Sequence, residues 1–372
     1  MKHGLQEYFV ETARQVADPD ENQLPSETES KCARLGEIFS KASSEGPAFD
    51  HLKKTTTLFG GQAISPSSAA GCIEDLQRSI KFIQAGYLAT KKALEKFEDR
   101  PIRVLEIGSG PYAPIATTLA SLFPQGEVEF MALDIYEVSI SCAKKVAEVL
   151  GQNNKYREDG FIVADATQII LPEEHRPHVS ICETMFTALE DEPQIAITAN
   201  LADQMVEGGF FLPEQVRVSA LIKEKPGNKY LGDIYVLDRS IAERVKTDGV
   251  LDPIKVEAEM IAEKIFHTDT KLSKTGNYII VETRVKIFEN IMLEPGESNI
   301  TATFPVYFKG KGKALTIGVK TGLGIAGGST IKKVVSSDSE NPCGYDKNWI
   351  NSHRLSSFWR FLEKLMPPGY PR

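Results

Sequence analysis

The stretch Val104-Leu105-Glu106-Ile107-Gly108-Ser109-Gly110-Pro111 decides the fold, because its pattern is that of a buried strand that runs into a glycine turn and opens a helix. Glycines in such a turn allow the backbone to approach a ligand closely. In an open α/β sheet, ligands bind at the carboxyl ends of the strands, where these turns lie. The stretch therefore predicts a parallel α/β sheet with a small-molecule site directly after this strand.

The chemistry of the turn distinguishes between two kinds of ligand. The dinucleotide pattern G-x-G-x-x-A is matched by Gly108, Gly110 and Ala113. A pyrophosphate is held by backbone N–H groups at a helix N-terminus, but Pro111 and Pro114 lack that group. Glu106 would also place a negative charge near the phosphates. These features favour S-adenosylmethionine (SAM), which has no phosphate and carries a cationic sulfonium and an ammonium group.

Two later strands end in acids where such a cofactor needs them. Residues 128–134 predict an apolar strand that ends in Asp134, about 20 residues beyond the glycines, as in other ribose-binding sheets. A carboxylate in this place is suited to accept both ribose hydroxyls. Residues 160–167 predict a third strand, where Asp165 would take the adenine amino group and the Ala166 N–H would lie near the ring.

The ordered set of glycine turn, ribose acid and adenine acid resembles the class I SAM-dependent methyltransferases. The resemblance implies a Rossmann-like domain and the cofactor SAM. It also implies a set of cofactor-binding residues, namely Glu106, Gly108, Gly110, Asp134, Asp165 and Ala166. The alternative is that these are solvated acids at ordinary strand ends.

The region between residues 179 and 214 narrows the resemblance. A fourth predicted strand, 179–182, is followed by Glu183, and Glu192 comes nine positions later, just before a predicted helix from Pro193. With the Gly-Gly-x-x-x-Pro exit at 208–213, this looks like the double-glutamate loop of the protein arginine methyltransferases. In that family two carboxylates grip the substrate guanidinium, so the resemblance implies Glu183 and Glu192 as catalytic residues. A guanidinium stays charged near neutral pH, and paired carboxylates are suited to hold its fork and aim one nitrogen at the methyl group.

The loop departs from the family's pattern in three ways. Aromatics and a glycine usually follow the first glutamate, but this chain has Thr184, Met185 and Thr187. Glu190 competes with Glu192 as the second carboxylate. The C-terminal part contains no Thr-His-Trp triplet. An alternative interpretation is that the acids at 190–192 stabilise the N-terminus of the following helix.

The segment before the glycine turn gives fewer indications of structure and function. Residues 1–60 predict short helices and loops that extend the domain and could cover the site. Ser65-Pro66 is a typical helix start, and apolar residues from Ile73 to Tyr87 follow at helical spacing. Arginine methyltransferases use an arginine in the corresponding helix to hold the SAM carboxylate, and the resemblance assigns this role to Arg78. A plain surface arginine is the alternative.

The C-terminal part, residues 215–372, predicts a β-rich second domain after the cofactor domain at 61–214. Its strands are expected at 215–222, 278–287, 300–308, 314–320 and 330–336. The family resemblance implies a barrel-like arrangement. Residues 223–266 contain charged segments that predict helix, which would be a dimerisation arm or a surface excursion. The basic run 309–313 predicts a hairpin turn.

Composition limits the partners and the compartment. The 372 residues are 41% hydrophobic and carry a formal charge of −8, which favours a cationic substrate over nucleic acid or an anionic membrane. The five cysteines show neither metal-site nor disulfide spacing. We expect no signal peptide, no membrane span and a cytoplasmic protein.

Together these features predict a SAM-dependent N-methyltransferase that acts on a guanidino group and forms a homodimer. The altered loop and the long N-terminal extension favour free arginine or a related small molecule as substrate, with protein arginine as the alternative. A different class of function also stays open, in which the protein binds SAM and methylates a non-guanidino group or nothing.

Overall fold

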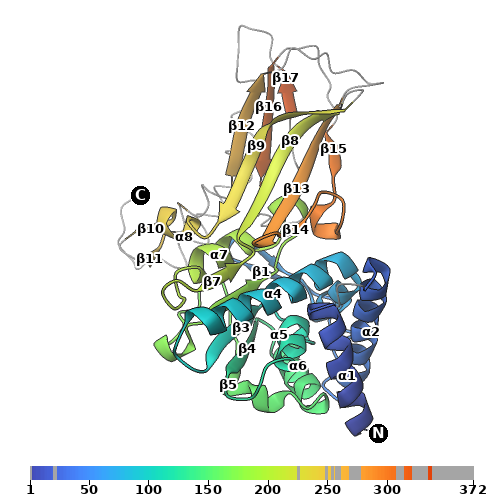
Figure 1. Cartoon of the computed structure of the whole chain (residues 1–372). Helices are drawn as coiled ribbons and strands as arrows, with labels where there is room; N and C mark the ends of the chain where they lie inside the picture. The colour runs from blue at the N-terminus through green and yellow to red at the C-terminus, as the bar shows by residue number, and fades with distance from the viewer. Residues whose placement is uncertain are drawn as a thin grey trace.

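The computed structural model describes residues 2–19, 23–223, 227–247, 250–252, 255, 261–267, 278–306, 314–320 and 334–336. It contains a helical and parallel-sheet part followed by antiparallel sheets (Figure 1). The predicted order of a Rossmann-like domain and a β-rich domain is therefore confirmed.

The first part is built on a parallel five-stranded sheet. Its strands are β3 (Ile102–Ile107), β4 (Val128–Asp134), β5 (Tyr156–Val163), β6 (Val179–Cys182) and β7 (Phe210–Leu212). They are arranged in the order β5-β4-β3-β6-β7, and all neighbours are parallel. The chain leaves β3 toward one edge and returns beside it as β6, so the strand order reverses between them. Ligands of open α/β sheets bind at such a reversal.

Successive side chains of the strands belong to two different apolar layers, one on each face of the sheet. Val104 belongs to the larger core, which includes residues of α4 (Leu76–Lys96), α5 (Pro114–Ala120) and α6 (Glu137–Val149). The next residue, Leu105, belongs to a second core with residues of α7 (Gln194–Leu201). Because successive side chains of a strand point to opposite faces, this division shows that helices cover both faces of the sheet.

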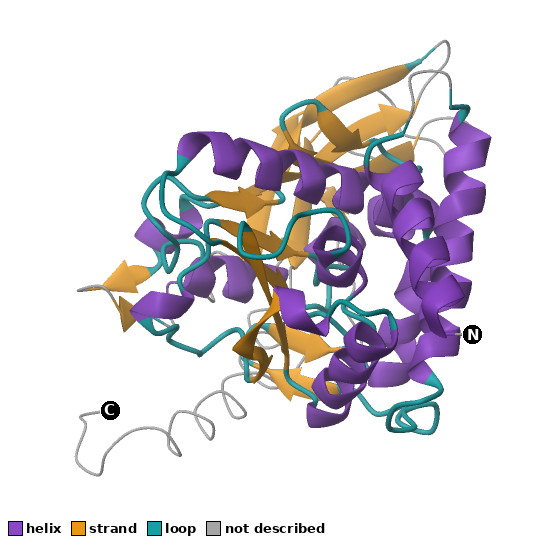
Figure 2. Ribbon diagram, turned by 60° about the horizontal axis from the view of Figure 1, so that its bottom comes forward, coloured by secondary structure: helices purple, strands orange, loops and turns teal. Residues whose placement is uncertain are grey.

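The N-terminal segment contains the predicted helices, α1 (Lys2–Ala17) and α2 (Pro25–Ser43). They lie side by side along one flank of the domain (Figures 1 and 2), and α2 packs against α4 and α6. The segment also contains a small unpredicted hairpin of β1 (Thr56–Leu58) and β2 (Gly61–Ala63).

The predicted continuous helix from Ser65 is wrong, because the structure divides it. Ser65 does cap a helix, α3 (Pro66–Gly71), but a 3-10 turn, η1 (Cys72–Glu74), follows and α4 begins only at Leu76. The carboxylate of Asp75 accepts the N–H of Arg78 at 3.3 Å. Asp75 is thus a second N-cap, and this competing local hydrogen bond starts a new helix.

The second part contains two antiparallel sheets. One has β8 (Gln215–Lys223), β9 (Asn228–Asp238), β13 (Tyr278–Phe288), β14 (Ile291–Leu293) and β15 (Phe304–Val306). The other has β12 (Ile261–His267), β16 (Ala314–Lys320) and β17 (Val334–Ser336). The strands predicted at 215–222, 278–287 and 314–320 are confirmed. The strand predicted at 300–308 begins only at Phe304, because a 3-10 turn, η5 (Asn299–Thr301), precedes β15, and residues 307–308 lie outside the described residues. The turn predicted at 309–313 lies outside the described residues.

Among the described residues of 223–266, the predicted helical character is confirmed only at 241–244. The described part of this segment contains β9, β10 (Lys246–Thr247), β11 (Val250–Leu251) and β12, and its helix α8 (Ile241–Arg244) spans a single turn. Pairing with β8 along the length of β9 decides the outcome, because tertiary context overrides the weak helix preference of the charged residues. In Figure 1, β9 lies beside β8 in the sheet.

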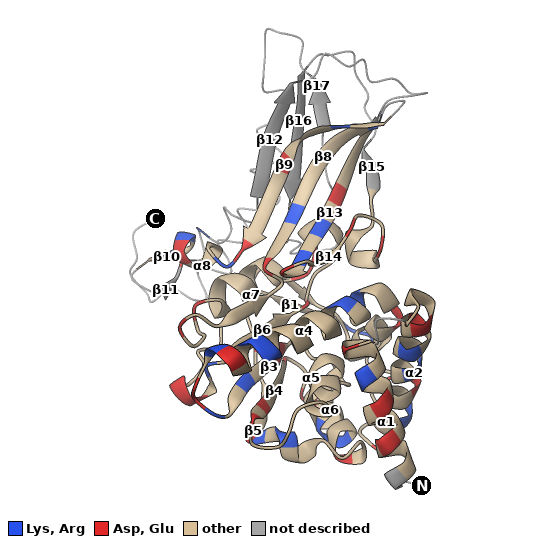
Figure 3. Ribbon diagram, viewed as in Figure 1, with Lys and Arg blue, Asp and Glu red and all other residues tan. Residues whose placement is uncertain are grey.

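Charged residues of both signs are interspersed over the helices and loops (Figure 3). Among the described residues, no helix combines the length and the apolar character needed to cross a membrane.

Candidate functional site

A pocket lies where the chain leaves β3 and β6, at the reversal of strand order. Its lining combines residues from the N-terminal hairpin, α4, the ends of three strands and the loop before α7. Eight residues predicted from the sequence line it, namely Arg78, Glu106, Gly108, Gly110, Asp134, Ala166, Glu183 and Glu192. The fold therefore brings the expected cofactor residues except Asp165, together with the expected substrate carboxylates, into one cavity.

The backbone conformation of the turn requires glycine at both positions. Gly108 has a φ of 71° and Gly110 has a φ of 59°, both in the left-handed region. A Cβ atom on Gly108 would also overlap with the methyl group of Thr184, which follows β6. The turn is held at the end of β4, since the N–H groups of Gly108 and Ser109 donate to the carbonyl of Leu133 at 2.8 and 3.0 Å.

Asp134 ends β4 beside this turn, as the sequence predicts. One carboxylate oxygen accepts the N–H of Gly110 and the other accepts that of Tyr136, each at 2.9 Å. Burial raises the pKa of Asp134, and the backbone hydrogen bonds oppose this rise. Each carboxylate oxygen can accept more than one hydrogen bond. Asp134 thus has acceptor capacity left for a pair of hydroxyl groups in the pocket.

Glu106 lines the pocket and also binds the N-terminus of α5. Its carboxylate accepts the N–H of Ala116 at 2.7 Å and that of Ile115 at 3.4 Å, at the start of α5. Side chains that accept from the first amides of a helix stabilise its N-terminus. Burial raises the pKa of Glu106 to about 8, although these two amides lower it.

Asp165, the acid that follows β5, differs from Glu106 and Asp134 because it lies outside the pocket lining. The carboxylate of Asp165 accepts the N–H and hydroxyl of Thr167 at 2.9 and 2.7 Å, and the side-chain amide of Gln168 at 2.7 Å. The residues on either side of it, Ala164 and Ala166, line the pocket, whereas Asp165 does not. The role of Asp165 toward adenine stays a prediction.

Arg78 and Glu183 form a buried ion pair. The Nη1 atom of Arg78 lies 2.8 Å from Oε2 of Glu183, and the side chains are only 14% and 11% exposed. Arg78 is therefore not a surface arginine. Burial raises the pKa of Glu183, and the charge of Arg78 opposes this rise. The Oε1 atom of Glu183 is buried without a hydrogen-bond partner among the described residues. Buried polar atoms are normally paired, so this atom is available to a ligand with a donor group.

Glu192, not Glu190, faces the cavity with Glu183. Burial raises the pKa of Glu192 to about 8, and the negative charge of Glu183 adds to this effect. Glu190 is absent from the pocket lining and directly follows the 3-10 turn η4 (Thr187–Leu189). The first turn of α7 contains no acidic residue and its N-cap, Pro193, receives no side-chain hydrogen bond, so none of the acids at 190–192 caps this helix directly.

The loop between the two glutamates is strained and anchored by distant elements. Ala188, Leu189 and Asp191 have positive φ values of 57°, 58° and 58°. Such residues persist only where their surroundings hold them. The N–H of Ala188 donates to the hydroxyl of Thr283 in β13 at 2.8 Å, and the carbonyl of Asp191 accepts the N–H of Gln62 in β2 at 2.7 Å.

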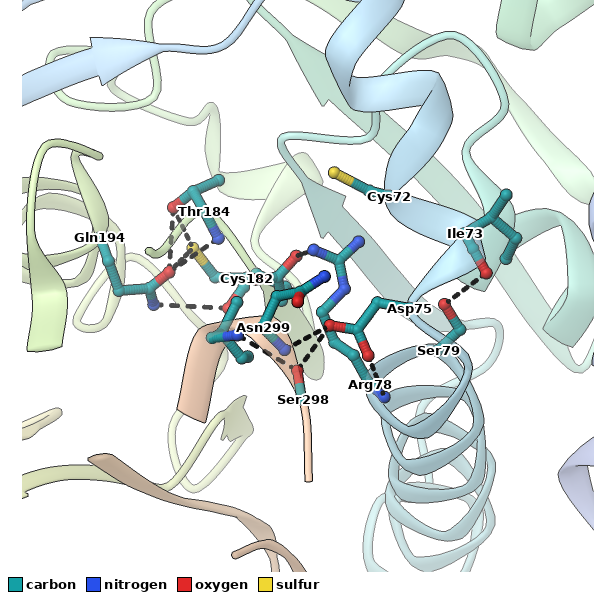
Figure 4. Close-up of polar contacts among 12 residues, drawn as sticks. Cys72, Ile73, Asp75, Arg78, Ser79, Cys182, Thr184, Gln194, Ser298 and Asn299 are labelled. Carbon is teal, nitrogen blue, oxygen red and sulfur yellow. Dashed lines mark hydrogen bonds and ion pairs between the residues drawn. The ribbon is translucent and has the colours of Figure 1, made fainter. Parts of the chain in front are cut away.

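The antiparallel part also contacts the helix that carries Arg78. The Asp75 carboxylate accepts the hydroxyl of Ser298 at 2.7 Å and the N–H of Asn299 at 2.8 Å (Figure 4). The same side chain caps α4, three residues before Arg78. Both parts of the chain therefore fix the position of the Arg78–Glu183 pair.

The sequence predicted that the N-terminal segment could cover the site, but not that a hairpin would form one wall of the pocket. Leu58, Ala63 and Ile64 contribute to the lining. The one available signal is Gly60-Gly61 between two short β-prone segments, which is typical of a tight hairpin. The anchors Thr283 and Gln62 have no local signature, because their contacts form only in the folded chain.

No protein-family model matches the sequence, and a search of curated proteins finds no match. Among solved structures, the chain is similar to Arabidopsis thaliana protein arginine methyltransferase 10, described in a uniquely open conformation, with 13% identity and a TM-score of 0.37. That match covers 63% of this chain and 84% of the other. A second match, YjhP from E. coli, has 18% identity, a TM-score of 0.24, and covers 37% and 51% of the two chains.

Proposed function

We propose that this protein is a SAM-dependent N-methyltransferase that acts on a guanidino group. The observation that carries the proposal is that the glycine turn, Asp134 and two buried carboxylates, Glu183 and Glu192, line one pocket. The pocket lies at the reversal of strand order, where open α/β sheets bind their ligands.

The residues of the pocket fit SAM. Gly108 and Gly110 leave the backbone open to close approach, and Asp134 has acceptor capacity for the ribose hydroxyls. The acidic residues suit the positive charges of the cofactor, and Arg78 has further donors for its carboxylate, since a guanidinium has five N–H groups. When bound, SAM supplies a methyl group activated by the sulfonium.

The two glutamates suit a guanidinium acceptor. Glu183 already holds the guanidinium of Arg78 at 2.8 Å and has a second oxygen free of protein partners among the described residues. Glu192 faces the same space. Together the two carboxylates would hold the fork of an acceptor guanidinium and localise its charge away from the nitrogen that reacts.

Glu192 is also suited to receive the proton that this nitrogen loses. Methylation of a guanidinium nitrogen would form an N–C bond while the methyl–sulfur bond of the sulfonium breaks and leaves its electron pair on sulfur. The nitrogen releases one N–H proton, so the methylated guanidinium remains a cation. Burial and the neighbouring Glu183 raise the pKa of Glu192 to about 8. A carboxylate with such a pKa is a better base near neutral pH than an exposed one.

We favour free arginine or a related small molecule over protein arginine. The support is the hairpin wall of Leu58, Ala63 and Ile64, together with the contact of Gln62 with the loop at Asp191. A wall beside the two carboxylates favours a compact acceptor.

The proposal is tested with the purified full chain. Calorimetry should detect SAM binding, and mass spectrometry should detect a 14-Da gain on an acceptor from a screen of free guanidino compounds, free amines and arginine-rich peptides. Methylation of free arginine supports the proposal, and methylation of peptides alone supports the protein-arginine alternative. Methylation of amines only, or SAM binding without any transfer, would contradict the guanidino assignment.

A further inference from the structure

One buried amide, Gln194, joins the two ends of the loop that carries Glu183 and Glu192. Its side chain is fully buried at the start of α7. The Oε1 atom accepts the N–H and the hydroxyl of Thr184, each at 2.9 Å. The Nε2 atom donates to the carbonyl of Cys182 at 3.4 Å. Figure 4 shows Cys182 and Thr184 beside this amide.

These contacts bracket both glutamates. Cys182 and Thr184 are the two chain neighbours of Glu183, and Gln194 lies two residues after Glu192. The same amide therefore sets the exit of the chain from β6 and its entry into α7. Because the loop between them contains three non-glycine residues in the left-handed region, local backbone preference does not hold its ends at this separation.

Thr184 extends this link to the glycine turn. Its hydroxyl donates to Gln194, while its methyl group occupies the space that a Cβ on Gly108 would need. A shift of Thr184 would therefore change the packing against Gly108 as well as the position of Glu183. Gln194, Thr184 and Gly108 form a continuous set of contacts from the loop to the predicted cofactor turn.

We propose that Gln194 is a positioning residue that sets the spacing of Glu183 and Glu192 and aligns this pair with the glycine turn. The inference rests on the proposed function and names a residue through which the two carboxylates act together. An amide is suited to the task because it accepts from Thr184 and donates to Cys182 at once. An apolar side chain of similar length would fill the space without directing either neighbour.

The test compares Gln194→Met with Gln152→Met in the full chain. Gln152 is also a buried glutamine whose amide donates to a backbone carbonyl, that of Leu150 at 2.9 Å. It lies just before β5, away from the pocket lining. For Gln194→Met we expect kcat for methyl transfer to fall about tenfold or more, since small misplacements of reacting groups are costly. We expect SAM affinity to fall less than kcat, because the link to Gly108 runs only through the methyl group of Thr184, and we expect Tm to change no more than in Gln152→Met.

A second variant isolates the contact itself. Thr184→Val removes the hydroxyl and keeps the shape, so it should lower kcat in the same direction as Gln194→Met. If both act through one hydrogen bond, the double variant should be no slower than Gln194→Met alone. An unchanged kcat in Gln194→Met, or equal losses of SAM affinity and kcat, would overturn the proposal, as would fully additive effects.

A measurement that does not depend on methyl transfer tests the role of Gln194 independently of the proposed function. Hydrogen exchange of the peptide that spans residues 183–193 should be about tenfold faster in Gln194→Met than in Gln152→Met, because an unanchored loop opens more often. If the wild-type chain methylates no acceptor but the exchange difference is found, the function fails and the structural role of Gln194 stands. If exchange in this loop is unchanged, the positioning role is refuted whatever the activity.

Discussion

Replacing Glu192 by glutamine is the most direct test of how the pocket holds its acceptor. The substitution keeps the size of the side chain and removes the negative charge. A hydrogen bond to a charged group contributes about 1.5–3 kcal/mol, and each 1.4 kcal/mol corresponds to about tenfold. Loss of this interaction and of the orientation it provides should therefore lower kcat/KM by on the order of 100-fold. SAM affinity should change little.

The pH dependence gives a second signature of the same residue. Burial and the charge of Glu183 raise the pKa of Glu192 to about 8, so a growing fraction of Glu192 is ionised as pH rises toward that value. Only the ionised form attracts a guanidinium and accepts its proton. We expect kcat/KM of the wild type to rise from pH 6 to pH 8 and then level off, and we expect this rise to disappear in Glu192→Gln.

Substitutions of two neighbouring glutamates complete the experiment. Glu190→Gln is the matched control, since Glu190 is in the same loop but outside the pocket lining, and it should lower activity by no more than a few-fold. Glu183→Gln should be as slow as Glu192→Gln, but it also removes the charge that pairs with Arg78, so its stability must be measured in parallel. Because one carboxylate alone does not hold the fork, the double variant should be much less affected than the product of the single effects implies. An essential Glu190 with a dispensable Glu192 would refute our assignment of the loop.

We make four further predictions. Asp134→Ala removes the predicted ribose acceptor, so SAM affinity measured by calorimetry should fall about tenfold, and an unchanged affinity would remove Asp134 from the site. Burial raises the pKa of Glu106 from the ordinary 4.5 to about 8, so the folded state retains a proton that the unfolded state loses in this window, and stability falls as pH rises. In Glu106→Gln, the free energy of unfolding should therefore decrease less as pH rises. Chemical denaturation should show a difference of about 1–3 kcal/mol from the wild type at pH 8. Gly61→Ala places a Cβ 2.6 Å from the carbonyl oxygen of Asp191, so it should lower stability by about 1–3 kcal/mol and slow methyl transfer, whereas Gly4→Ala, which meets open space, should do neither. Light scattering at micromolar concentration should give the mass of two chains, and a monomer would contradict the homodimer that the family resemblance implies.

The sequence by itself determined the parallel sheet and the end of the sheet at which the site lies. The buried strand before Gly108 and the acids after the next strands are local patterns, and parallel strands necessarily bring their carboxyl ends to one edge. The nine-residue spacing of Glu183 and Glu192 was visible in the same way. Each of these inferences needs only residues close together in the chain.

Contacts between distant residues decided the rest. Pairing with β8 makes residues 228–238 a strand, although charged residues nearby predicted helix. The pairing of Arg78 with Glu183 and the closure of the loop by Gln194 join elements whose separation in space no local pattern encodes. Hydrogen bonds and ion pairs of buried groups depend on which partners the fold brings within reach, so only the tertiary structure determined how the pocket holds its two carboxylates.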